Sequence, residues 1–267
     1  MLTKLIKHDI KSIGKLLLPL NALILLMAVV GMILQATGLF YLVNARPLLA
    51  LLFTSYVIAM AVIAVVSYFY PIIHFYRNLF SRQGYLTFTL PVSSWMILLS
   101  KTIVGFGWYL INITVSLFSM WAISGFMRIP NAYMEDINHH LMEEIGMSFS
   151  ILMSWTIGIT FVSLLWSLLT AYFSISIGQL VAKHKIIASV ATYVGIYTVM
   201  QILMTIVLIP VILRGTVVSD YMMVMNAQIV YDIITTTFYT IAVFSVMLSG
   251  LFYVFTGVIM KKKVNLD

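Results

Sequence analysis

The chain has 267 residues, of which 62% are hydrophobic and only 9% are charged, and its mean hydropathy is +1.07. An ordinary soluble domain is about half apolar and about a quarter charged, so this composition excludes a soluble globular enzyme. The absence of cysteine excludes disulfide scaffolds, thiolate metal sites and cysteine nucleophiles. The net charge of +7 is spread over short clusters between apolar runs, which indicates membrane topology rather than a nucleic-acid-binding face. We therefore expect an all-α polytopic membrane protein.

Residues 1–16 predict an amphipathic helix that lies along the cytoplasmic membrane surface. Its apolar positions recur at helical spacing, namely Leu2, Leu5, Ile6, Ile10, Ile13 and Leu17. Its lysines form the opposite stripe, namely Lys4, Lys7, Lys11 and Lys15. This pattern disfavours the other interpretation of a basic start before an apolar run, a cleaved signal peptide. Pro19 is expected to mark the bend into the first membrane span.

Six stretches reach the roughly 20 apolar residues that a spanning helix needs. They are residues 17–43, 49–73, 101–127, 148–180, 187–212 and 233–260. With the N-terminus inside, twelve of the fifteen Lys and Arg residues lie on the inner side, and only Arg46, Arg128 and Arg214 lie outside. This bias predicts a multi-pass protein of the plasma membrane with both termini in the cytoplasm. The segments 128–147 and 213–232 are the longest polar ones and fall outside, so residues 1–267 form a single transmembrane domain.

No sequence motif for catalysis or nucleotide binding is present, so we expect no catalytic, cofactor-binding or metal residues and no enzymatic activity in this chain. The cluster His139, His140, Glu143 and Glu144 has two interpretations, a metal site or a solvated polar helix. The solvated helix is favoured, because two His and two Glu on one helix, without a ligand from another fixed element, are weak evidence for a metal site.

Among the polar side chains in or beside the predicted spans, three are considered as functional candidates. Asn112 and Gln201 either line a substrate path or serve helix packing, and packing is the commoner role of such amides. His74 lies at the inner end of the second span. A proton relay would need an acidic partner for it, and no acidic residue falls within the predicted spans.

The segment 77–100 is cytoplasmic by the charge argument, yet it is rich in Leu, Phe, Tyr and Trp. An exposed apolar surface of this kind marks either a partner-binding or interfacial site, or an apolar approach to the third span. Both interpretations stay open from composition alone.

Short motifs in this segment make the chain similar to a known family. They are RNLF at 77–80, GYLT at 84–87, LPVS at 90–93 and SK at 100–101, with a second match in SISIGQL at 174–180 followed by KHK at 183–185. With the amphipathic start and six spans, the chain resembles the permease subunits of ABC type-two exporters, of the small type found in Gram-positive bacteria.

The resemblance implies a permease without a nucleotide site. Two copies of a separate ATP-binding subunit, which uses ATP and magnesium, would act on two permeases, the second being the same or a related chain. The segment between the second and third spans would be the coupling helix, starting near Leu79 and ending before Pro91, although residues 85–90 alternate as in a strand. The residues that the resemblance assigns to ATPase coupling are Arg77, Leu79, Phe80, Gly84, Tyr85, Leu86 and Pro91.

The expected function is ATP-driven export of a hydrophobic or amphipathic substrate, for example an antimicrobial or other peptide. The lipid bilayer is the remaining expected partner, and no nucleic acid is expected to bind. Two alternatives stay open. One is an ion-driven secondary transporter, against which the lack of acids within the predicted spans argues. The other is a non-transporting membrane scaffold or immunity protein.

Overall fold

The computed structural model describes residues 2–37, 46–81, 84, 92–124, 131–181, 183–222 and 227–262. These residues form seven helices and contain no strand. Six of the helices are long and apolar enough to cross a membrane, so the prediction of an all-α polytopic membrane fold is confirmed. Contacts divide the chain into two compact units, one that contains residues 1–128 and one that contains residues 129–265, and each is described by itself.

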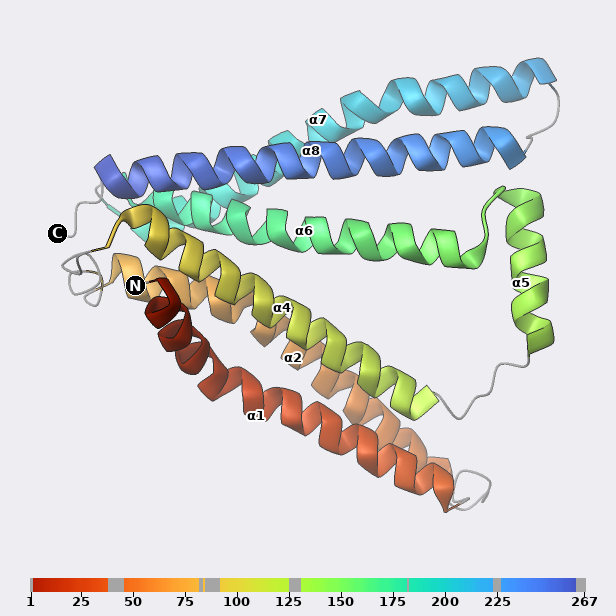
Figure 1. Cartoon of the computed structure of the whole chain (residues 1–267), viewed down its shortest axis with the longest axis horizontal. Coiled ribbons are helices and arrows are strands. Elements are labelled where there is room, and N and C mark those ends of the chain that lie inside the picture. Colours follow the sequence, from red (N-terminus) through yellow and green to blue (C-terminus); the bar gives the residue numbers. More distant parts are fainter. Residues whose placement is uncertain are drawn as a thin grey trace. The chain divides into compact units, whose positions relative to one another are not determined.

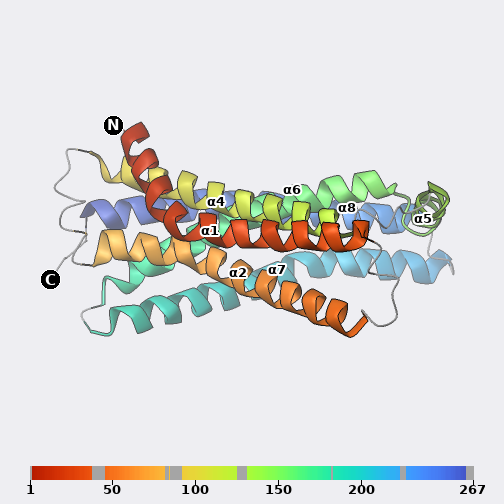
Figure 2. The same cartoon turned by 90° about the horizontal axis from the view of Figure 1, so that it is seen from below.

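The first unit is a three-helix bundle. It contains α1 (Leu2–Ala36), α2 (Arg46–Phe80) and α4 (Ser94–Ser124), which run alternately up and down (Figure 1). The N-terminus, the end of α2 and the start of α4 therefore lie at the same end of the unit, as both views show (Figures 1 and 2). Only residues 81–93 connect α2 to α4 at that end.

Helix α1 differs from the sequence prediction, which separated an amphipathic helix at 1–16 from a span at 17–43. The structure has one helix from Leu2 to Ala36 with Pro19 inside it. A proline removes one backbone hydrogen bond and pushes the preceding turn aside, and the first turns of α1 indeed run at an angle to the rest (Figure 1). The predicted end at residue 43 lies outside the described residues.

Tight packing of α1 against α4 explains why the helix continues through the proline. Ile13 and Leu17 of α1 are buried in one cluster with Val104 and Trp108 of α4. A Cβ on Gly14 would lie 3.0 Å from the Trp108 ring, so glycine at this position allows the indole to approach the α1 backbone. This contact keeps the turns before Pro19 attached to the bundle.

The second unit contains α5 (Asn131–Glu144), α6 (Phe149–Gly178), α7 (Lys185–Met222) and α8 (Ala227–Lys262). Helix α6 packs against both α7 and α8, and the short polar helix α5 lies across the ends of α6 and α8 (Figure 1). The segment 213–232, predicted as a polar outer connection, is largely helical, since α7 continues to Met222 and α8 begins at Ala227. Both helices exceed the length that the bilayer requires.

Candidate functional site

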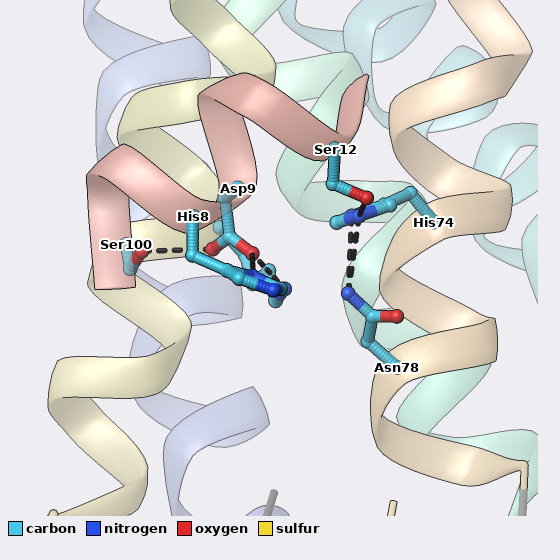
Figure 3. Close-up of polar contacts among 7 residues, drawn as sticks. His8, Asp9, Ser12, His74, Asn78 and Ser100 are labelled. Atoms are coloured by element: carbon cyan, nitrogen blue, oxygen red, sulfur yellow. Dashed lines mark hydrogen bonds and ion pairs between the residues drawn. The ribbon is translucent and has the colours of Figure 1, made fainter. Parts of the chain in front are cut away.

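A group of hydrogen-bonded polar side chains in the first unit (Figure 3) lies on the first turns of α1, the last turns of α2 and the first turns of α4. Its side chains come from all three helices of the unit. We call it the polar clamp, and it consists of Asp9 and Ser12 of α1, His74 and Asn78 of α2, and Ser100 and Lys101 of α4.

The centre of the polar clamp is an ion pair between α1 and α4. The Lys101 ammonium donates to Oδ1 of Asp9 over 2.5 Å, and the Ser100 hydroxyl donates to Oδ2 over 2.9 Å. Both charged side chains are buried, with 4% of Asp9 and 7% of Lys101 exposed. Nδ1 of His8 lies 3.9 Å from the same carboxylate, but the His8 side chain is 79% exposed. Each carboxylate oxygen of Asp9 thus has a hydrogen-bond donor from α4.

Burial of this pair is tolerable only because each charge has its partner. Removing two charges from water costs several kcal/mol per ion, and close pairing with further hydrogen bonds offsets that cost. Asp9 is the only acidic residue among residues 1–128, which contain nine Lys and Arg residues. No second acid in the first unit can therefore replace Asp9 as the partner of Lys101.

A second contact ties α1 to α2. The Ser12 hydroxyl lies 3.0 Å from His74 Nε2, and the Asn78 amide nitrogen lies 3.1 Å from the same ring atom (Figure 3). His74 itself is buried, with 7% exposed. Hydrogen bonds therefore fix the first turns of α1 to the last turns of α2 as well as to the first turns of α4. The connection 81–93 joins the two helices that the polar clamp holds together.

The residues that the resemblance assigned to coupling differ in burial where the structure describes them. Arg77 is exposed, Phe80 is half-buried and Leu79 is fully buried within the first unit. Leu79 and Phe80 belong to the last turn of α2 and do not start a separate helix. The backbone N–H of Gly84 donates to the carbonyl of Ser81 over 2.7 Å. Tyr85, Leu86 and Pro91 lie outside the described residues.

Asn112, one of the two predicted mid-membrane amides, contributes to packing in the first unit. It is 8% exposed, and its Oδ1 accepts a hydrogen bond from Ser67 of α2 over 3.2 Å. The hydroxyls of Tyr56 and Ser119 form a similar link between the same two helices over 2.7 Å. These contacts favour helix packing over a substrate path for Asn112. Gln201 belongs to the second unit and is exposed on α7.

The His/Glu cluster lies on α5, as the solvated-helix interpretation expected. His139 Nδ1 is 3.3 Å from Glu143 Oε2, and both side chains are more than half exposed. Within the described parts of the chain, no three His, Asp or Glu side chains gather closely enough to hold a metal ion.

No family model, curated protein or solved structure matches the chain. The polar clamp is therefore interpreted from its geometry alone. The Asp9–Lys101 pair was not predicted, because Lys101 was expected at the opening of the third span and residues 1–16 were expected to form an amphipathic helix at the membrane surface. The signal that could have found the pair is the charge count of residues 1–128, where a single acid stands against nine bases.

Proposed function

We propose that this chain is the transmembrane permease subunit of an ATP-driven exporter and that a separate ATPase acts on residues 81–93. The chain is then a non-catalytic subunit, with ATP and magnesium bound by two copies of the partner, and a second permease completes the exporter. The substrate class that fits spans without acids in α2, α4 and α6 is hydrophobic or amphipathic, such as a peptide.

The observation that carries the proposal is the position of the polar clamp at the end of α2 and the start of α4, the two helices that residues 81–93 connect in the sequence. A partner that displaces this connection acts on the end of α2 and the start of α4. The hydrogen bonds of Asp9 and His74 pass that displacement to α1, so the three helices of the first unit respond together. Rigid elements joined by buried polar contacts are the physical means by which such displacement is transmitted.

Co-purification tests the partnership directly. The tagged chain in mild detergent should retain a soluble ATPase, and Leu86→Glu should remove it and stop ATP-driven export. The matched control is Met142→Glu, which introduces the same charge at an apolar residue that is 54% exposed and lies on α5. A chain that retains no ATPase in several detergents, or export that survives Leu86→Glu, would overturn the proposal.

We also propose that the chain resides in the plasma membrane with both termini in the cytoplasm, as the twelve-to-three distribution of basic residues favours. The chain contains no cysteine, so single cysteines report topology without background. Thr3→Cys should be shielded from an impermeant maleimide in intact cells, whereas Met142→Cys should react. Labelling at Thr3 in intact cells would reverse the assignment.

A second candidate function is ion-driven transport, and the buried Asp9–Lys101 pair is the observation that favours it. Ionisable side chains within membrane-length helices are costly and often mark ion or proton paths. Under this alternative the purified chain alone would carry flux in liposomes with an ion gradient and no ATP, and Asp9→Asn would stop it. The exporter assignment requires the opposite result, no flux without the ATPase.

A further inference from the structure

We propose that α1 carries a surface for anionic phospholipid headgroups, formed by Lys4, Lys7, Lys11 and Lys15, and that the Asp9–Lys101 pair sets its orientation. We call these four residues the lysine face. The proposal does not depend on the transport function, because it concerns the chain and the bilayer alone.

The lysine face is continuous and solvent-exposed. Its residues follow one another at intervals of three and four, which places them on one side of an α-helix, and all four are exposed. Asp9 projects from the opposite side of the same turns, where it is buried against Lys101. Ser12, Ile13 and Leu17 also contact neighbouring helices. The fold therefore holds the lysine face away from the bundle.

The first unit supplies no negative charge to the lysine face. Asp9 is the only acid among residues 1–128, and its two carboxylate oxygens are bound by Lys101 and Ser100. Four neighbouring ammonium groups on one side of a helix repel one another by a few tenths of a kcal/mol per pair. An external acidic partner removes that repulsion.

One side of α1 changes from charged to apolar along the helix, and this change indicates that the partner is a lipid surface. The same side of the helix continues at intervals of three and four through Leu18, Ala22, Leu25, Val29 and Ile33. Leu18, Val29 and Ile33 are 52–61% exposed, so this side becomes apolar directly after Lys15. From Leu18 to Ala36 the helix rises about 27 Å, close to the roughly 30 Å of a hydrocarbon core. An exposed apolar stretch of that length, ended by lysines, matches the boundary between acyl chains and headgroups.

The bend in α1 keeps the lysines near that boundary. A straight helix would carry Lys4 about 16 Å beyond Lys15, past the headgroup layer. The first turns instead run at an angle to the rest of α1 (Figure 1), and Pro19 supplies the break. The hydrogen bonds of Asp9 and Ser12 hold these turns in that direction.

The test uses the full chain in nanodiscs of phosphatidylcholine with or without phosphatidylglycerol. A fluorophore on Thr3→Cys, the chain's sole cysteine, is quenched by brominated phosphatidylglycerol or by brominated phosphatidylcholine, and the ratio gives the lipid preference. One lysine beside an anionic surface changes binding about fivefold. We therefore expect Lys7→Gln with Lys11→Gln to lower the preference by at least fivefold.

Two comparisons separate the lysine face from charge in general. The matched control is Lys183→Gln with Lys261→Gln, which changes the net charge equally at two exposed lysines of the second unit and should lower the preference less than twofold. An equal loss in both pairs would overturn the proposal. The proposal would also be overturned if the original chain shows no lipid preference and the variant Lys7→Gln with Lys11→Gln loses a bound protein. The partner of the lysine face would then be an acidic protein.

The contribution of the ion pair is tested by Asp9→Asn with Lys101→Gln, which leaves the net charge unchanged. We expect a severalfold weaker preference for phosphatidylglycerol, because the first turns of α1 lose their ion pair with α4 and keep only the apolar contact of Ile13 and Leu17. If this variant folds and its preference equals that of the original chain, the pair does not orient the lysine face. If it does not fold, Ser100→Ala removes one bond to Asp9 and is expected to lower the preference less, in the same direction.

Discussion

Removing only one partner of the Asp9–Lys101 ion pair should destabilise the protein more than removing both charges. Asp9→Ala leaves the Lys101 ammonium, 7% exposed, without an acidic partner, and Lys101→Met leaves a 4% exposed carboxylate with Ser100 as its remaining donor. Loss of one partner of a buried pair costs about 3–5 kcal/mol. The double variant Asp9→Ala with Lys101→Met buries no isolated charge, so we expect it to recover about 2 kcal/mol relative to either single variant.

Thermal unfolding in one detergent measures this cycle. For a chain of this size about 1 kcal/mol corresponds to about 2–4 °C, so each single variant should unfold roughly 10 °C earlier and the double variant nearer to the original chain. Trp108 is buried beside Ile13 and Leu17 and reports the opening of this interface by fluorescence. Glu143→Gln is the control, since it breaks an exposed pair with His139 and should not change the unfolding temperature.

Two results would refute this reasoning. If either single variant unfolds within about 3 °C of the original chain, about 1 kcal/mol by the same conversion, the pair is not held in a low-dielectric setting. If the double variant is as unstable as the sum of the singles, the two charges contribute independently and do not interact across α1 and α4.

Two further predictions concern helix contacts away from the polar clamp. Gly178→Ala should destabilise the α6–α7 contact by about 1–3 kcal/mol, because a Cβ there would lie 2.6 Å from the backbone nitrogen of Ser189. Gly107→Ala, where a Cβ meets no atom within 4 Å, should not destabilise the fold in the same unfolding assay, and equal losses would contradict the packing argument. Tyr56→Phe should cost about 1 kcal/mol, since it removes the hydroxyl bond to Ser119, and a double-mutant cycle with Ser119→Ala should give a coupling energy near that value. A coupling near zero would show that the bond contributes nothing to stability.

The sequence predicted the spans well because hydropathy over about 20 residues is a local property. The six predicted stretches overlap the six membrane-length helices. The ends were less accurate, and α7 illustrates the reason. Residues 213–222 were assigned to a polar connection, yet they continue the helix. A helix that leaves the bilayer can satisfy its own backbone hydrogen bonds, so its end is not fixed by the point where hydropathy falls.

The polar clamp could not be predicted from local patterns. Asp9 and Lys101 are 92 residues apart in the sequence, and each has an ordinary local interpretation, one as part of an amphipathic helix and one as a basic residue at a span entrance. Only the packing of α1 on α4 brings them together. Asn112 shows the complementary case, because the general tendency of mid-membrane amides toward packing agrees with its bond to Ser67.

The lysine face and the connection 81–93 share one support, and this links the two proposals. The polar clamp holds α1 to both helices that border the connection. If lipid headgroups bind the lysine face, they fix the first turns of α1 and, through Asp9, the start of α4. A displacement imposed on residues 81–93 must then move against the lipid contact or rotate α1 within it. Bilayer charge should therefore alter the coupling between ATP hydrolysis and export in the original chain, and the charge-neutral substitution of Asp9 and Lys101 should remove that sensitivity.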